Sequence, residues 1–267
     1  MSNSSTNNHF KVIAVTNQKG GVGKTTTTIN LSAALVELGK KVLIIDLDPQ
    51  GNASTGLGID YEQRNLTVYD VLLAEAAISS AILPTSMAGL DIVPSTVDLS
   101  SADIELIKTP NHSTALSRAL VEDKTLADNY DFIFVDCPPS LSLLTINAMV
   151  VSDSVLIPLQ SEFFALEGLS QLMLSVREVR KSVNTGLRFE GVVLTMFDRR
   201  NNLSQQVEKD ARENLGELVF KTVIPRNVRV SEAPSHSVPV LTYEPRSRGA
   251  QAYRRLAKEF LKNNKSI

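Results

Sequence analysis

Short apolar runs rich in Val and Ile alternate along this chain with longer segments in which apolar residues recur at the spacing of a helix. A short apolar run between turn residues is typical of a strand that is buried on both faces of a parallel sheet. The strands predicted on this basis are residues 11–16, 41–46, 90–93, 131–136, 154–159, 191–195 and 219–224.

Segments with helical periodicity lie between these strands. Alternation of strand and helix indicates an α/β fold, because a helix returns the chain to the start of the next parallel strand. We therefore expect a single-domain α/β protein with a mostly parallel, twisted sheet and helices on both faces. The predicted helices are residues 25–38, 100–107, 114–127, 141–149, 166–181, 203–215 and 250–261.

Composition agrees with a single core. The chain has 267 residues, of which 43% are hydrophobic, and no repeat, linker or change of composition divides it, so residues 11–267 are expected to form one domain. Residues 1–10 begin with the polar run MSNSSTNNH, which lacks the basic start and apolar core of a secretory signal, and we expect a disordered tail. No run of eighteen apolar residues indicates a membrane span. Cys137 is the single cysteine, which excludes an intrachain disulfide and fits a cytoplasmic location.

Charge is distributed unevenly along the chain. Residues 1–176 hold 9 Lys+Arg against 19 Asp+Glu, whereas residues 177–267 hold 18 against 10. A basic region on a nearly neutral protein suggests a polyanionic partner such as nucleic acid, although composition alone is equally compatible with a solvated surface.

A glycine-rich segment with two lysines lies between the first predicted strand and the first predicted helix. Strand, glycine-rich loop and helix form the context of a phosphate-binding loop, in which backbone N–H groups converge on phosphate oxygens. Lys24 would supply charge to the outer phosphates, and the Thr25 hydroxyl suits Mg²⁺. The segment therefore predicts a nucleoside triphosphate site. Its residues are Lys19, Gly20, Gly21, Val22, Gly23, Lys24, Thr25 and Thr26.

The loop departs from the general pattern at its start. Gln18 stands where a glycine is expected, and Lys19 adds a second positive charge close to Lys24. Two lysines so close repel each other unless an anion lies between them or Lys19 points elsewhere, for example into the nucleotide of another subunit.

Carboxylates follow two of the predicted strands. Asp46 and Asp48 lie two residues apart, so in an extended segment they share one face and could both point toward the phosphates. The run 132–136 is four apolar residues closed by Asp136, which would hold Mg²⁺ through water while Thr25 is the direct ligand. Cys137 and the two prolines after it would form a stiff loop able to sense the last phosphate.

Several segments together resemble the ParA/Soj chromosome-partition ATPases, which have a deviant Walker A motif and belong to the ParA/MinD superfamily. They span most of the chain in the order that the family has. The segments are 17–27 (NQKGGVGKTTT), 42–58 (VLIIDLDPQGNASTGLG), 136–140 (DCPPS), 162–168 (EFFALEG) and 223–235 (VIPRNVRVSEAPS).

The resemblance implies a P-loop, Mg²⁺-dependent ATPase that forms an ATP-sandwich homodimer and binds DNA without sequence preference. Slow hydrolysis, stimulated by a ParB-type centromere-binding protein, would then drive segregation of chromosome or plasmid. It further implies a cytoplasmic, nucleoid-associated protein. No helix-turn-helix segment precedes the loop, so we expect the small chromosomal type.

The resemblance also implies roles for particular residues. Lys19 would reach across the dimer to the partner's phosphates, with Gly20 at the same seam, and Lys19, Lys24 and Asp48 would be catalytic. Asp46 would support the Mg²⁺ shell from the second layer. Pro225 and Arg226 match the adenine side of the pocket, and Arg200 and Arg229 match DNA-binding positions.

Three alternatives remain at this point. A MinD-like membrane-cycling ATPase shares the loop, and the last predicted helix has an apolar face, but core packing explains that face more simply and we expect no membrane binding. An iron protein of the nitrogenase type needs more cysteine ligands than one per chain. A nucleotide-binding module without turnover is the third, and Asp48 argues against it. The apolar face comprises Tyr253, Leu256, Ala257, Phe260 and Leu261.

Overall fold

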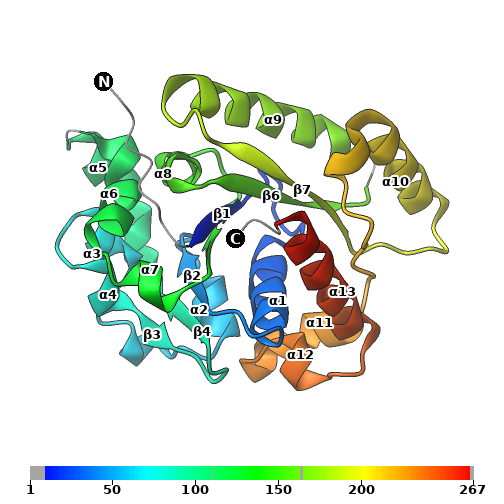
Figure 1. The fold of residues 1–267 in the computed structure, drawn as a ribbon, viewed down its shortest axis with the longest axis horizontal. Helices are drawn as coiled ribbons and strands as arrows, with labels where there is room; N and C mark the ends of the chain where they lie inside the picture. The colour runs from blue at the N-terminus through cyan, green and yellow to red at the C-terminus, as the bar shows by residue number, and fades with distance from the viewer. Residues whose placement is uncertain (1–9, 110, 163–164, 265–267) are drawn as a thin grey trace.

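The computed structural model describes residues 10–109, 111–162 and 165–264. Within these ranges the strands form one seven-stranded sheet in the order β3-β4-β2-β5-β1-β6-β7 (Figure 1). Every neighbouring pair is parallel except the antiparallel pair β3 and β4 at one edge. The strands are β1 (Lys11–Val15), β2 (Val42–Asp46), β3 (Leu83–Pro84), β4 (Leu90–Val93), β5 (Phe132–Asp136), β6 (Ser154–Gln160) and β7 (Arg188–Thr195).

Helices connect the strands and surround the sheet. Five short 3₁₀ turns in the described ranges join them: η1 (Tyr61–Gln63), η2 (Val97–Ser101), η3 (His112–Thr114), η4 (Gly216–Leu218) and η5 (Ala233–His236). The α-helices are α1 (Lys24–Val36), α2 (Asn52–Gly56), α3 (Val68–Leu72), α4 (Ile78–Ala81), α5 (Ala102–Ile107), α6 (Ala115–Glu122), α7 (Leu126–Asn129), α8 (Leu143–Val151), α9 (Ala165–Ser182), α10 (Asn202–Leu215), α11 (Val228–Glu232), α12 (Val240–Tyr243) and α13 (Arg248–Asn263).

The sheet is buried on both faces, as the apolar runs predict. Along β1, Ile13 and Val15 enter the core on one face, whereas Val12 and Ala14 enter the core on the other. Helices α1 and α13 lie side by side over the first face (Figure 1). Helices α3, α5, α6 and α8 cover the second face, and α9 packs over β6 and β7. The predicted fold class is therefore confirmed.

The last helix is held to the sheet by an aromatic cluster. Phe260 on α13 is fully buried, and its ring lies 5.4 Å from the ring of Phe132, edge to face. Burial of one phenylalanine side chain contributes about 2 to 3 kcal/mol. The apolar face of α13 is thus core, as the sequence favours: Tyr253, Leu256 and Ala257 are at most 1% exposed. Leu261 is partly buried against the same core.

Six of the seven predicted strands are confirmed within a few residues, but the strand predicted at 219–224 is wrong. This segment runs beside β7 with two isolated bridges, Val192 to Val219 and Phe197 to Pro225, and no continuous ladder. Its central amides donate elsewhere: Lys221 N and Thr222 N donate to the carboxylate of Glu259 on α13, at 2.6 and 2.9 Å. Alternate amides of a parallel strand face its neighbour, so Thr222 N would follow Phe220 N, which donates to Val192 O at 2.9 Å. Glu259 takes the Thr222 amide instead, so a side chain distant in sequence interrupts the strand.

The helix predicted at 114–127 is divided into α6 and α7. Asp123 leaves the helical conformation at φ −93° and ψ 94°, and its carboxylate accepts from Thr125 N at 3.1 Å and Thr125 Oγ1 at 2.6 Å. Local bonds of this kind compete with the helical ladder, which explains the break. Of the predicted tail, residues 1–9 lie outside the described residues, and Phe10 is buried.

Candidate functional site

The glycine-rich loop follows β1 and leads into α1 at the carboxyl edge of the parallel strands. Gly21 has φ +73° and Gly23 has φ +88°, a left-handed conformation that other residues adopt at a cost. Asn17 fixes the start of the loop, since its Nδ2 donates to Pro158 O at 2.8 Å and its Oδ1 accepts from Lys19 N at 3.0 Å. The loop is therefore preshaped, with the start of α1 directed at whatever occupies it.

Gly20 differs from its neighbours. Its φ is not in the left-handed region, and a Cβ added there would meet nothing within 4 Å. Neither backbone conformation nor packing within this chain requires glycine at this position.

Lys24 is the first residue of α1 and is only 7% exposed. Its Nζ donates to the backbone carbonyl of Lys19 at 3.1 Å, across the loop. Burial lowers the pKa of Lys24, while the nearby carboxylates of Asp136 and Asp48 oppose that change. A phosphate anion in the loop would compensate the buried ammonium in the same way.

Lys19 points away from the loop that it begins. Its Nζ lies 2.5 Å from Glu162 Oε2, and both side chains are nearly half exposed. The structure therefore separates the two lysines, which the sequence left open: Lys24 turns into the loop and Lys19 pairs with a carboxylate of its own chain.

Asp46 and Asp48 follow β2 but have different surroundings. Asp48 is 7% exposed, lines the pocket beside the loop, and accepts from Gln50 N at 2.9 Å. Asp46 is fully buried, and its Oδ2 accepts from Ser54 N at 2.8 Å and Ser54 Oγ at 2.7 Å. Burial raises the pKa of Asp46 to about 6, against the hydrogen bonds from Ser54. Only Asp48 of this pair can touch a ligand directly.

Asp136 ends β5 beside Asp46, its register partner on β2. It is fully buried, and its Oδ1 accepts from Thr28 Oγ1 at 2.9 Å. Burial and the nearby Asp46 raise the pKa of Asp136 to about 7, while the hydroxyls of Thr25 and Thr28 oppose the rise. Its Oδ2 has no hydrogen-bond partner within the described residues.

A divalent cation fits this donor set. Mg²⁺ prefers oxygen ligands and is usually bound by one or two protein groups together with phosphates and water. The unpaired Asp136 Oδ2, with the Thr25 hydroxyl close to the same carboxylate, offers such oxygens beneath the loop. A cation there would also favour the charged form of a carboxyl group whose pKa burial has raised.

Two connected pockets flank the loop and share Gly23, Thr26, Met196 and Pro234. The first, about 480 Å³, is lined by predicted phosphate-binding residues and Asp48; the second, about 490 Å³, by the predicted adenine residues Pro225 and Arg226. Lys19 and Val22 line neither, and the Val22 carbonyl accepts from Thr195 Oγ1 at 2.8 Å. The predicted residues in the first pocket are Gly20, Gly21, Gly23, Lys24, Thr25, Thr26 and Asp48.

The sequence interpretation missed many of the residues that line these pockets, among them Met196 and Asn227. Met196 follows β7 and has φ +50°, an uncommon conformation for a residue other than glycine, and it lines both pockets. Asn227 immediately precedes α11 and lines the second pocket. In the sequence, only their positions pointed to the site: Met196 directly follows the predicted strand 191–195, and Asn227 lies within the segment 223–235.

The two predicted DNA-binding residues lie in different surroundings. Arg200 is 90% exposed, contacts Asp198 at 3.2 Å, and lines a basic hollow of about 600 Å³. Arg229 is about half exposed and donates to Glu232 Oε2 at 2.8 Å; it does not line that hollow. Besides Arg200, the hollow is lined by Arg199, Arg226, Arg248 and Arg255.

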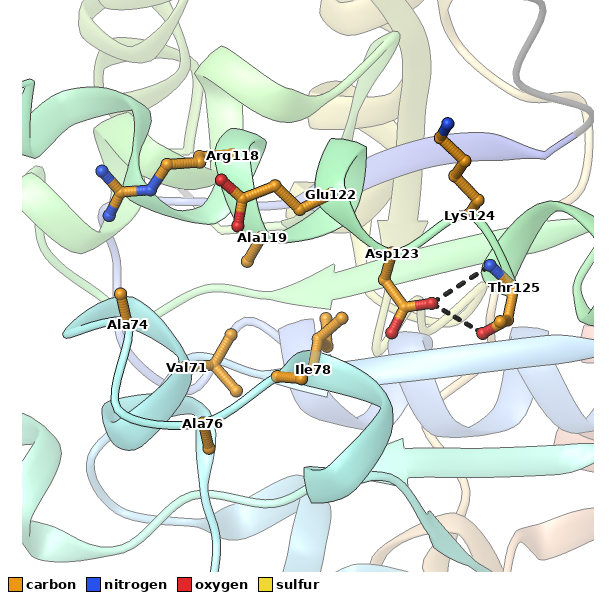
Figure 2. A pocket seen from close by; sticks show the side chains of 11 residues that line it. Val71, Ala74, Ala76, Ile78, Arg118, Ala119, Glu122, Asp123, Lys124 and Thr125 are labelled. Carbon is orange, nitrogen blue, oxygen red and sulfur yellow. Dashed lines mark hydrogen bonds between the residues drawn. The ribbon is translucent and has the colours of Figure 1, made fainter.

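A further pocket lies apart from these residues. Figure 2 shows it between α6, with Arg118 and Glu122, and the segment that carries Val71, Ala74 and Ile78. Its volume is about 480 Å³, and none of the predicted site residues lines it.

No helix in the described part of the chain combines the length and apolarity needed to cross a bilayer.

Comparisons with known proteins agree with this geometry. Residues 10–189 match the model of a family described as an AAA domain. The sporulation initiation inhibitor protein Soj of Bacillus subtilis is 54% identical over 95% of this chain and 99% of its own length. The chromosome partitioning protein ParA of Caulobacter vibrioides is 54% identical over 95% of each chain.

A solved structure matches the whole fold. The cobyrinic acid a,c-diamide synthase of Mycobacterium smegmatis, with bound ATP analogue and magnesium, has a TM-score of 0.83 and 36% identity over 96% of each chain.

Proposed function

This chain belongs to the Soj/ParA family of chromosome-partitioning ATPases, and we propose that ATP binding drives it to dimerise and to hold DNA without sequence preference. Hydrolysis would then release the DNA when a ParB-type centromere-binding protein stimulates turnover. On this proposal the protein works in the cytoplasm on the nucleoid.

Gly20 carries the proposal of a dimer. This chain alone does not need glycine at this position, because a Cβ there meets nothing within 4 Å and the φ is ordinary. A second copy approaching over the nucleotide would need the space that a side chain removes. Lys19, next to it, already points out of its own loop and would then reach the partner's phosphates.

ATP would lie across the two connected pockets. The backbone of the loop and Lys24 would bind the triphosphate, and Pro225 and Arg226 would lie beside adenine. Thr25 would hold Mg²⁺ directly and Asp136 through water, with Asp46 behind them. The cation, when bound, neutralises phosphate charge. The unpaired Asp136 Oδ2 supports this assignment.

Asp48 would orient the water that attacks the last phosphate. Its carboxylate lines the phosphate pocket, and its remaining hydrogen-bonding capacity is open to a water molecule, since the bond from Gln50 N occupies Oδ1. Phosphoryl transfer needs mainly positioning and charge neutralisation, which Lys24 and the partner's lysine at position 19 would supply.

DNA would be bound through its phosphates by Arg200 and Arg229. Both side chains are substantially exposed, and each pairs with a single carboxylate that a phosphate can replace. Dimerisation doubles this surface, so the affinity for DNA should depend on the nucleotide and fall steeply with salt.

Sedimentation of the purified protein with Mg²⁺ and ATP, ADP or no nucleotide tests the dimer. The wild type should sediment as a dimer with ATP alone, and Gly20→Val should remain a monomer that still binds nucleotide. Gly186→Val is the matched control, because a Cβ at this exposed glycine makes only an ordinary contact of 3.6 Å. If Gly20→Val formed dimers with the wild-type affinity, Gly20 would not lie at the contact between the two subunits.

A further inference from the structure

We infer that Arg64 is a positioning residue for the hydrolysis step, because its guanidinium fixes the segment that carries Asp48. This inference rests on the proposed function, since it needs Asp48 to orient the attacking water. Arg64 directly follows the short turn η1 and lines neither of the two pockets beside the phosphate loop. It would therefore act on the reaction from outside the nucleotide site.

The guanidinium of Arg64 joins two loops at the carboxyl edge of the sheet. Its Nε and Nη2 donate to Ile59 O at 3.1 and 2.7 Å, and Nη2 also donates to Thr55 Oγ1 at 2.9 Å. On the other side, Nη1 donates to Ser95 O at 3.0 Å, two residues beyond β4. Four hydrogen bonds from one rigid, planar group hold the segment 55–59 against the end of β4.

The same guanidinium lies against the turn that follows Asp48. A Cβ added to Gly51 would lie 2.6 Å from Arg64 Nη1 and 2.9 Å from Ser95 O, so only glycine leaves the space that Arg64 occupies. Gly51 has φ +60°, and its N–H donates to Asp48 O at 2.9 Å. The turn from Asp48 to Gly51 is thus packed directly against Arg64.

A chain of hydrogen bonds links the loop after β4 to the backbone of Asp48. Ser95 N donates to Ser54 Oγ at 3.1 Å, and Ser54 Oγ donates to Asp46 Oδ2 at 2.7 Å. Asp46 Oδ1 in turn accepts from Asp48 N at 3.3 Å. Because Arg64 holds the carbonyl of Ser95, its loss would loosen this chain as well as the turn after Asp48.

These contacts should matter for the rate of hydrolysis rather than for nucleotide binding. A misplacement of about 1 Å in a group that orients a reactant can cost about a hundredfold in rate. Binding of ATP, in contrast, would depend on the phosphate loop and Lys24. The hydrogen bonds of Arg64 in the described part of the chain all go to the segments 55–59 and 95.

Steady-state ATP hydrolysis and ATP binding, measured on the full chain with Mg²⁺, test the inference in Arg64→Ala and Arg64→Lys. Arg64→Ala should lower kcat about tenfold or more, while the KM for ATP and ATP-dependent dimerisation stay within about twofold of the wild type. Arg64→Lys keeps the charge but loses the planar fork, so its kcat should remain close to that of Arg64→Ala. Arg118→Ala, which removes an exposed arginine on α6, is the control and should change neither quantity.

Three results would overturn the inference. The first is an unchanged kcat in Arg64→Ala with only a lower midpoint of urea unfolding, which would make Arg64 a structural residue alone. The second is an equal loss of ATP binding, which would show damage to the whole nucleotide site. The third is the full rate in Arg64→Lys, because a lysine cannot make the four bonds. Failure of the wild type to hydrolyse ATP is a different result, because it would contradict the proposed function itself.

Discussion

The ammonium group of Lys19 lies 2.5 Å from a carboxylate oxygen of Glu162, although 143 residues separate them in sequence. The other carboxylate oxygen of Glu162 accepts from the Gln160 side chain, at the end of β6. Exposed ion pairs of this kind contribute about 0.2 to 1 kcal/mol. The pair is thus strong enough to hold Lys19 outside its own loop and weak enough to exchange for a phosphate.

Glu162→Gln should strengthen ATP-dependent dimerisation by about 1.5-fold to 5-fold, because Lys19 no longer has to leave a carboxylate. Sedimentation equilibrium with ATP measures the dissociation constant of the dimer. Glu178→Gln, which removes the exposed pair between Glu178 and Lys181, is the matched control and should have no effect. A weaker dimer in Glu162→Gln would mean that Glu162 presents Lys19 to the partner instead.

Asp48→Ala should abolish ATP turnover and leave ATP-dependent dimers and DNA binding intact. Asp48 lines the phosphate pocket, and its side chain accepts a hydrogen bond from the nearby backbone amide of Gln50. Its replacement should therefore reduce the rate of hydrolysis more than the stability of the fold. Steady-state phosphate release should fall by about a hundredfold or more. Turnover at the wild-type rate would remove Asp48 from the mechanism.

Arg229→Glu should weaken DNA binding at every sequence tested and reduce its salt dependence, while dimers still form. Glu232→Gln should act in the opposite direction, because it frees the Arg229 guanidinium from its present partner. Lys181→Glu makes the same change of charge on α9 and serves as control. Undiminished binding by Arg229→Glu would place the DNA surface elsewhere, with the basic hollow around Arg200 the first region to test.

Asp46→Asn should flatten the pH dependence of stability in the protein without nucleotide. The pKa of Asp46 is raised from 3.8 to about 6, so between these values the folded state binds more protons than the unfolded state. This group therefore lowers the free energy of unfolding as pH rises from about 4 to about 7. Asp136, with a pKa raised to about 7, acts in the same direction and leaves a residual slope in the variant.

Urea unfolding at pH 5, 6, 7 and 8, with a chelator present, compares the two proteins. Asp46→Asn should lose less stability than the wild type over this range. Equal slopes would show that Asp46 is charged throughout in the folded protein.

The sequence predicted the parts of the site that depend on local conformation. Gly21 and Gly23 have the left-handed φ that a phosphate loop requires, and the apolar run 132–136 forms a buried strand that ends in Asp136. The order of strands and helices was readable for the same reason, because each apolar run or helical period is a local signal.

Relationships between distant residues were not readable. Glu162, the partner of Lys19, follows the end of β6, and Glu259 on α13 takes the Thr222 amide that a strand at 219–224 would need. Arg200 and Arg229 are both arginines of the basic C-terminal third of the chain. In the fold, however, Arg200 lines the basic hollow, whereas Arg229 lies outside it and pairs with Glu232. Tertiary contacts decide each of these cases, and no local pattern encodes them.

The central claim, that ATP-driven dimerisation creates the DNA-binding state, is tested most directly by a DNA titration at fixed salt. The wild type, Gly20→Val and Asp48→Ala are each measured with ATP, ADP and no nucleotide, and anionic liposomes serve as the competing surface. The account predicts tight DNA binding only with ATP, retained by Asp48→Ala and lost by Gly20→Val, with no recruitment to liposomes. DNA binding that ignores the nucleotide, together with ATP-dependent binding to liposomes, would contradict it and favour a membrane-cycling ATPase.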